Sequence, residues 1–142
     1  MRLVLDTNVI LASVLSDAGA SRQLLQYALS RQIVTLCSVP LMPEYESVLK
    51  RQHHLESAGI TVEDVDTLLD ALAAVIEPVR FSFLWRPMLK DAKDEMVLAT
   101  AVNGQADAPI TRDLTELAPN LAGFGIRAMA PGPAVRWIRS MQ

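Results

Sequence analysis

Four acidic residues stand where strand or helix patterns begin or end in this chain: Asp6, Glu44, Asp94 and Asp113. A group of carboxylates without His or Cys favours Mg²⁺ or Mn²⁺ over softer metals. Two such ions a few ångströms apart can activate a water and stabilise the leaving oxygen of a phosphodiester. The four acids are therefore candidate metal ligands and candidate catalytic groups.

Each acid also has a structural interpretation, which the sequence leaves open. Asp94 and Asp113 could be helix N-caps, and Glu44 could be a solvated helix residue. Asp6 is harder to explain in this way, because Asp is disfavoured beside an apolar strand and Asn8 could do any capping needed. The set is more persuasive than any member, since right-handed crossovers bring all four acids to one edge of a parallel sheet.

The elements that must position these acids follow from the hydrophobic pattern. Short apolar runs alternate with amphipathic segments, which predicts an α/β fold with a parallel sheet covered on both faces. Strands are expected at residues 3–5, 33–37, 75–79, 108–111 and 126–129. Helices are expected at 9–15, 20–31, 41–52, 61–73, 94–103, 113–117 and 131–141, with a polar loop at 53–59. Thr61 and Asp64 have capping-box spacing, and Gly104 suits a helix C-cap.

Composition places the chain among ordinary globular domains. It has 142 residues, of which 51% are hydrophobic, and a net charge of −3, which does not indicate nucleic-acid binding. We expect a cytoplasmic protein, because no apolar run reaches the ~20 residues of a membrane helix and no signal-peptide pattern is present. The single Cys37 fits a reducing compartment, and a buried strand residue is favoured over a nucleophile there.

Four segments carry a family resemblance: residues 5–9 (Leu-Asp-Thr-Asn-Val), 38–49, 91–101 and 110–114. In their order and spacing they resemble the PIN-domain nucleases, most closely the toxin-like branch that includes the VapC toxins. The resemblance reaches from near the start of the chain to about Leu117. It implies one PIN domain over residues 1–142, a three-layer α/β/α Rossmann-like fold with a central parallel sheet of about five strands.

The resemblance also implies an activity, a cofactor and partners. The activity is metal-dependent endoribonuclease cleavage of RNA with Mg²⁺ or Mn²⁺, as the toxin of a type II toxin–antitoxin pair. The partners are the RNA substrate, a small antitoxin protein and a second copy of the chain in a homodimer. The family's core acids carry over onto Asp6, Glu44, Asp94 and Asp113. Asn8 and Thr111 match its supporting polar positions, Asp91 matches an extra acid common in this branch, and Glu116 falls where some members have a further acid. Thr7 is expected to position ligands or waters by hydrogen bonds.

Basic and aromatic residues near these segments have two interpretations each. Phosphate contacts are expected from Arg112, Lys93 and Arg51, and also from Arg86 and Lys90, unless these residues form only a solvated surface. His53 and His54 are interpreted as loop residues rather than catalysts. The apolar stretch of Phe81, Phe83, Leu84, Trp85 and Met88 is interpreted as a packed loop or as an interface with a partner, and Trp137 is similarly ambiguous.

Two prolines depart from the family's pattern. Pro43 precedes Glu44 inside an expected helix, where it could kink or delay the first turn and change the aim of Glu44. Pro109 lies in an expected central strand, which could shorten that strand and alter the placement of Asp113.

Two other function classes compete with a nuclease. A haloacid-dehalogenase-like phosphotransferase also begins with a strand and an Asp, but it needs a second acid where Asn8 stands. A PIN-like scaffold could bind RNA or protein without cutting, although four retained acids argue against it.

Overall fold

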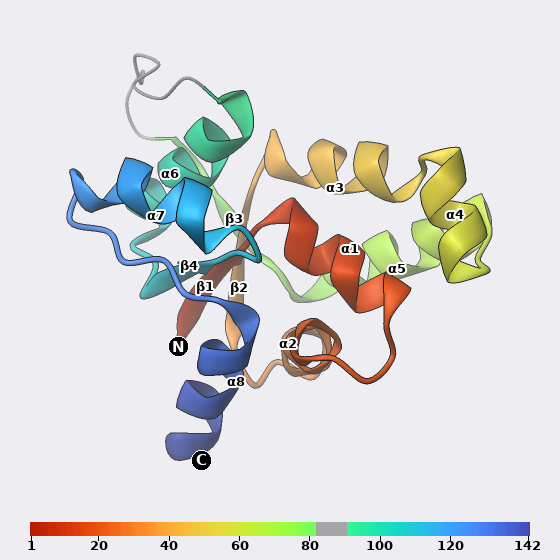
Figure 1. Ribbon diagram of the computed structural model, residues 1–142, viewed down its shortest axis with the longest axis horizontal. Helices are drawn as coiled ribbons and strands as arrows, with labels where there is room; N and C mark the ends of the chain where they lie inside the picture. Colours follow the sequence, from red (N-terminus) through yellow and green to blue (C-terminus); the bar gives the residue numbers. More distant parts are fainter. Residues whose placement is uncertain (82–90) are drawn as a thin grey trace.

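A parallel sheet forms the centre of the molecule. The structure is a computed structural model that describes residues 1–81 and 91–142 (Figure 1). Within these residues the sheet has four strands in the order β3-β2-β1-β4. They are β1 (Arg2–Leu5), β2 (Val34–Ser38), β3 (Glu77–Val79) and β4 (Ala108–Ile110). Every pairing is parallel, with Leu3 opposite Thr35 and Ala108. The four carboxyl ends therefore meet at one edge of the sheet.

Helices cover both faces of this sheet, which gives three α/β/α layers (Figure 1). One layer contains α1 (Thr7–Leu15), α2 (Ala20–Leu29), α3 (Leu41–Leu49), α4 (Gln52–Ala58) and α5 (Val62–Val75). On the other side α6 (Ala92–Gly104) contacts all four strands and α7 (Leu114–Ala122) packs on α6. The last helix, α8 (Pro131–Ser140), packs against α2.

The direction of the chain through the sheet changes once. From β1 it proceeds outward to β2 and β3, and the crossover through α6 then returns it to the opposite side of β1 as β4. Ligands of open α/β sheets bind at the carboxyl ends of the strands beside such a switch point. Here the switch point lies between β1 and β4, so the end of β1 at Leu5 borders it directly.

The core is aliphatic and continuous across the layers. The central strands contribute Leu3, Leu5 and Leu36, all fully buried, and α6 contributes Leu98. Cys37 is buried on β2, and burial raises the pKa of its thiol to about 12. The expectation of a buried strand residue at Cys37 is therefore confirmed, since a thiol with this pKa holds little thiolate at neutral pH.

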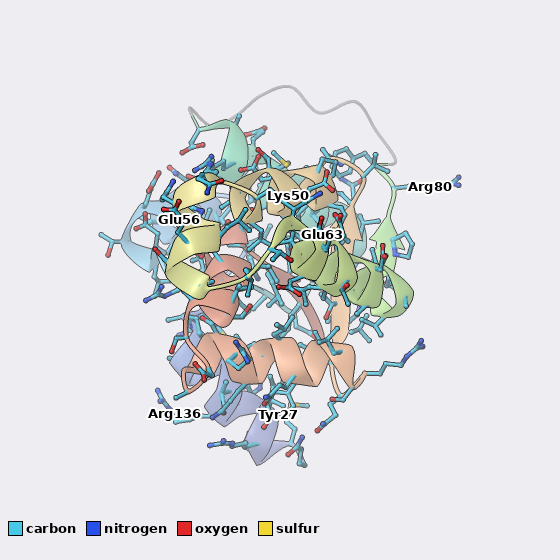
Figure 2. The ribbon with its side chains drawn as sticks, turned by 90° about the vertical axis from the view of Figure 1, so that its right-hand side faces the viewer. Tyr27, Lys50, Glu56, Glu63, Arg80 and Arg136 are labelled. Carbon is cyan, nitrogen blue, oxygen red and sulfur yellow. The ribbon has the colours of Figure 1, made fainter. Side chains whose placement is uncertain are left out.

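The outer layer of helices is held by surface ion pairs as well as by apolar packing. Lys50, the C-cap of α3, lies 2.6 Å from Asp66 of α5 and 3.1 Å from Glu46. Figure 2 shows Lys50 where α3 meets α5. Tyr27 and Arg136 lie at the opposite end of the molecule, on α2 and α8. In the described ranges 1–81 and 91–142, no helix has the length and apolar content to cross a membrane.

Several sequence expectations were wrong in detail. Residues 53–59 are not a polar loop but belong largely to α4, which ends at Ala58 and is capped by Gly59 with a positive φ of 66°. The sequence hides this helix because only Leu55 of α4 is buried, so no apolar period marks it. Gly104 is not a C-cap but the last residue of α6, where a Cβ would lie 2.9 Å from Val79 and 3.0 Å from Leu36.

The expected fifth strand at 126–129 is also absent from the described residues. Its only pairing is an isolated bridge between Met129 and Ile110, in which Met129 N–H donates to Pro109 O at 2.9 Å. Continuing this parallel ladder would require an N–H on Pro109, which proline lacks. Because Asp6 N–H donates to Ile110 O at 2.8 Å, the proline leaves the pairing of β4 with β1 intact.

Pro43 has no disruptive effect on α3. The helix starts at Leu41, so Pro43 is its third residue, where the N–H would have no partner inside the helix. Glu44 consequently lies in the first turn of a regular helix, next to the fully buried Tyr45. The Tyr45 hydroxyl donates a hydrogen bond to Leu5 O, which holds the start of α3 against the end of β1.

Candidate metal centre

An acidic cleft opens at the switch point, above the ends of β1 and β4. Its volume is about 310 Å³. Five of the residues that line it were expected at the site from the sequence and carry oxygen ligands or polar groups: Asp6, Thr7, Asn8, Asp91 and Asp113. Lys93, Arg51, His54 and Glu116 line it as well. The chain therefore brings residues from both halves of the sequence to one concave surface.

Asp6 and Thr111 form the floor of this cleft. Thr111 is fully buried, and its hydroxyl donates to Asp6 Oδ2 at 2.8 Å. The Thr111 hydroxyl oxygen also accepts from Asn8 Nδ2 at 3.2 Å and from Asp113 N–H at 3.1 Å. Asp6 Oδ1 accepts from Thr7 N–H at 2.7 Å, so Asp6 is itself the N-cap of α1. Thr111 and Asn8 thus hold Asp6 and the start of the Asp113 segment in register.

Asp91 and Asp94 approach the cleft from the first turn of α6. Asp91 is the N-cap, because its Oδ1 accepts from Lys93 N–H at 2.8 Å. Asp94 therefore does not cap this helix, and its buried side chain accepts from Asn120 Nδ2 of α7 at 3.0 Å. Asp91, Asp94 and Glu116 each offer an oxygen within 4.8 Å of the others.

Glu116 lies one helical turn beyond Asp113 and shares a hydrogen bond with it. Asp113 is at the N-cap position of α7, where its side chain makes no capping bond. The bond to Asp113, and next the Asp113 charge, raise the pKa of Glu116 from 4.5 to about 7. Asp94 and Asp91 act in the same direction. The carboxylates of α6 and α7 are thus close enough to compete for protons.

Burial and like charges also act on the two central acids. Burial raises the pKa of Asp6, while hydrogen bonds from Thr111 and from Thr7 N–H lower it. Burial likewise raises the pKa of Asp94, and the charges of Asp91 and Asp113 add to that increase. In both cases the surroundings favour the protonated carboxyl group over the ionised carboxylate.

Glu44 lies in the first turn of α3 and, unlike Asp6 and Asp113, does not line the cleft. Its Oε1 is buried and, within the described part of the chain, has no hydrogen-bond partner. Lys93 Nζ of α6 lies 3.9 Å from that oxygen. A buried carboxylate oxygen without a hydrogen bond is costly unless a cation compensates it. Lys93 supplies positive charge beside this oxygen but, at 3.9 Å, no hydrogen bond, so the burial of Oε1 is only partly compensated.

The donor set fits a hard divalent cation. Carboxylates are the ligands that Mg²⁺ and Mn²⁺ prefer, and they come here from the residue after β1 and from the first turns of α6 and α7. The closest group, Asp91, Asp94 and Glu116, shares only Asp94 with the four acids expected from the sequence. Asp6 interacts electrostatically with Asp94, and Asp113 with Glu116, so these acids adjoin the closest group.

The residues expected to contact RNA are divided between two hollows. Arg51 and Lys93 line the acidic cleft. Arg112 donates its backbone N–H to Asn8 Oδ1 at 3.0 Å but lines a neighbouring hollow of about 350 Å³ beside α1, α2 and α8. His54 lines the acidic cleft, with its Nδ1 paired with Val48 O at 2.7 Å.

Some expectations fall on residues that the structure does not describe. Arg86 and Lys90 lie outside the described residues, as do Phe83, Leu84, Trp85 and Met88. Phe81, next to this stretch, is 41% exposed. Trp137 is partly buried against the core and lines an apolar hollow with Met129 and Pro133.

Sequence reasoning gave Glu116 a minor place and missed Asn120. Both lie on α7 at helical spacing from Asp113, three and then four residues apart, and so on the same face. That spacing was a readable signal. It could be interpreted only once α7 was known to pack beside α6.

The fold and the site together define a class: a three-layer α/β protein with converging carboxylates at its switch point. A family profile described as "PIN domain" matches residues 2–115, which is more than half of the 142 residues. The chain belongs to the PIN-domain family. PIN domains are generally metal-dependent nucleases. No curated protein and no solved structure gives a significant match. Glu116 and Asn120 lie beyond the matched residues.

Proposed function

We propose that this PIN domain is a metal-dependent endoribonuclease that hydrolyses RNA phosphodiester bonds. The observation that carries the proposal is the convergence of Asp6, Asp113 and Glu116 on one cleft at the switch point, with Asp94 hydrogen-bonded at its edge. Family membership supports nuclease chemistry. RNA as the substrate and Mg²⁺ or Mn²⁺ as the ion rest on the resemblance of the motifs and on the oxygen-only donor set.

The acids of the cleft would hold the cation. Asp91, Asp94 and Glu116 are the closest group, Asp6 and Asp113 adjoin it, and Glu44 pairs with Lys93 of α6. When bound, a divalent ion supplies Lewis acidity that activates water and offsets the charge of the phosphodiester. In the metal-free protein, mutual repulsion and burial disfavour ionised carboxylates at this site, which makes it cation-seeking.

The remaining polar residues would orient the acids and the substrate. Thr111 fixes Asp6 Oδ2, so this carboxylate presents a defined face to the cleft. Asn8 uses both ends of its amide, donating to Thr111 and accepting from Arg112 N–H. These bonds hold the floor of the site in one arrangement, and preorganised groups are what phosphoryl transfer requires.

Cations at the rim would hold the RNA backbone. Lys93 and Arg51 line the cleft, and Arg112 lines the adjacent hollow. These side chains would contact the phosphates of an RNA strand and hold it over the acids, although the net charge of the protein is −3. A bound cation further reduces the negative potential that the acids present to the RNA.

The biological setting is the finer part of the proposal. The resemblance to the toxin-like branch supports a cytoplasmic toxin, neutralised by a small antitoxin protein and acting as a homodimer. An RNA-processing nuclease would have the same site chemistry. Expression of the protein in cells distinguishes the two roles. A toxin should arrest growth, and co-expression of a short reading frame that neighbours its gene should relieve the arrest.

The chemistry is tested by replacing Asp6. Asp6→Asn keeps the N-cap of α1, because Asn caps helices as well as Asp does, but it removes a carboxylate. We expect Mn²⁺-dependent cleavage of single-stranded RNA to be lost while the melting temperature stays close to that of the parent. Asp70→Asn, on the exposed side of α5, is the matched control and should retain full activity.

Three results would contradict the proposal. Full activity of Asp6→Asn would remove this carboxylate from the mechanism. Binding of Mn²⁺ without turnover on any RNA would instead identify a binding scaffold. Hydrolysis of a generic phosphate monoester, in place of RNA, would indicate a phosphatase.

A further inference from the structure

Asn120 connects the two helices that carry most of the carboxylates. It lies on α7, in the turn after Glu116, and its Nδ2 donates to Asp94 Oδ2 of α6 at 3.0 Å. The same nitrogen donates to Glu116 O at 3.2 Å. Both partners are acceptors only, so the two bonds fix which end of the amide faces Asp94. The bond to Glu116 O, within α7, thus holds the Asn120 amide nitrogen in place for its bond to Asp94.

The position of this bond within the site gives it a specific consequence. Asp94 belongs to the closest carboxylate group, with Asp91 on its own helix and Glu116 on α7. The Asn120 bond crosses from one helix to the other at that group. It therefore links the helix that carries Glu116 directly to Asp94 of α6. Asn120 is not an acid and does not line the described cleft, so its effect on a cation would be indirect.

We propose that Asn120 is a positioning residue that sets the cation affinity of the site by fixing Asp94 relative to Glu116. This inference rests on the proposed function, since it concerns the same cation. Residues that orient metal ligands through hydrogen bonds typically change metal affinity by 10- to 100-fold when removed. A site held at fixed spacing also favours the smaller Mg²⁺ and Mn²⁺ over Ca²⁺, which tolerates variable geometry.

The experiment measures cation binding directly, apart from catalysis. The purified full chain is titrated with Mn²⁺ and, separately, with Ca²⁺ by calorimetry, and the melting temperature is recorded without metal. The variants are Asn120→Ala and Asn120→Ser, which both remove the amide donor. Asn120 is exposed, so neither change is expected to prevent folding. Thr115→Ala, at another exposed position of α7, is the matched control for changes in helix stability.

We expect both Asn120 variants to bind Mn²⁺ about tenfold more weakly or worse, with a smaller loss for Ca²⁺. Thr115→Ala should bind both ions as the parent does. A purely structural role would lower the melting temperature and leave Mn²⁺ affinity unchanged, and this result would overturn the inference. Equal losses in Thr115→Ala would overturn it as well.

The failure of the inference can be told apart from the failure of the proposed function. If the parent binds Mn²⁺ and cleaves RNA while the Asn120 variants bind Mn²⁺ equally well, only the positioning role is refuted. If the parent binds no Mn²⁺ and cleaves no RNA, the proposed function is refuted, and the inference is refuted with it.

Discussion

The Thr111 hydroxyl donates a hydrogen bond to the Asp6 carboxylate at 2.8 Å and so joins the ends of β1 and β4 beneath the acidic cleft. Thr111 uses its full hydrogen-bonding capacity, since the same oxygen accepts from Asn8 Nδ2 and from Asp113 N–H. One hydroxyl thereby aligns Asp6, which follows β1, with Asp113, which follows β4.

Thr111→Val should damage both activity and stability. Valine keeps the buried volume but leaves Asp6 Oδ2, Asn8 Nδ2 and Asp113 N–H without this partner. We expect a loss of about 1–3 kcal/mol in urea unfolding. Cleavage should slow by about tenfold or more, because a ligand-orienting bond is lost. Thr115→Val, exposed on α7, is the control, and parental cleavage rates in Thr111→Val would contradict the role given to this hydroxyl.

Stability of the metal-free protein should fall as pH rises toward neutrality. The pKa of Glu116 is raised from 4.5 to about 7, so the folded protein keeps a proton that the unfolded chain releases. The stabilisation from this proton is complete below pH 4.5 and is lost as pH rises through about 7. The pKa values of Asp6 and Asp94 are also raised, which gives the same sign.

The check is urea unfolding in the presence of a chelator across this pH range. Glu116→Gln should show a flatter dependence than the parent, because Gln cannot titrate. An unchanged slope in that variant would show that Glu116 does not carry the effect.

Adding cation should stabilise the protein most where the carboxylates are ionised. Ligand that binds only the folded state contributes about 2.7 kcal/mol at a concentration of 100 times Kd. We expect Mn²⁺ to raise the melting temperature more at pH 8 than at pH 5, with reversal by chelator. A shift of the same size in Asp6→Asn and Asp94→Asn would place the cation elsewhere.

RNA binding should depend on the cations of the cleft rim. Arg51→Gln removes one positive side chain that lines the cleft. For single-stranded RNA, losing one phosphate contact should reduce the slope of log K against log salt concentration by about 0.7. Arg139→Gln is the matched control, because Arg139 lines a separate hollow beside α2. Equal effects of the two changes would indicate nonspecific attraction.

Close packing of α6 on the sheet makes Gly104 sensitive to substitution. In Gly104→Ala the new methyl group would lie 2.9 Å from Val79 Cγ2 and 3.0 Å from Leu36 Cδ1, so these side chains must shift. Overpacking typically costs about 1–3 kcal/mol, partly offset by about 1 kcal/mol of helix propensity. We expect net destabilisation of about 1 kcal/mol in urea unfolding.

Gly123→Ala serves as the control for Gly104→Ala. A Cβ there meets no atom within 4 Å, and its φ of −63° suits any residue. This variant should be neutral or slightly stabilising. Equal stability of the two variants would show that the side chains of Leu36 and Val79 can shift without lowering the free energy of unfolding.

The local pattern was sufficient for much of the fold. The capping box of Thr61 and Asp64 is present as expected, and so are the strands that precede Asp6 and Asp113. Weak periodicity concealed α4, and the missing N–H of Pro109 reduced the expected fifth strand to a bridge. Pro43 proved harmless because α3 begins early enough to place it in the first turn.

The sequence by itself determined the order of the motifs, the parallel sheet and the edge at which Asp6 and Asp113 would meet. Strand and helix patterns are local, and parallel topology then leaves little freedom for where the strands end. Only the tertiary structure decided which side chains meet across elements: Glu44 with Lys93, and Asn120 with Asp94. These pairs depend on how α3, α6 and α7 pack beside one another. Such packing distances are set by the whole core and leave no trace in the spacing of any one segment.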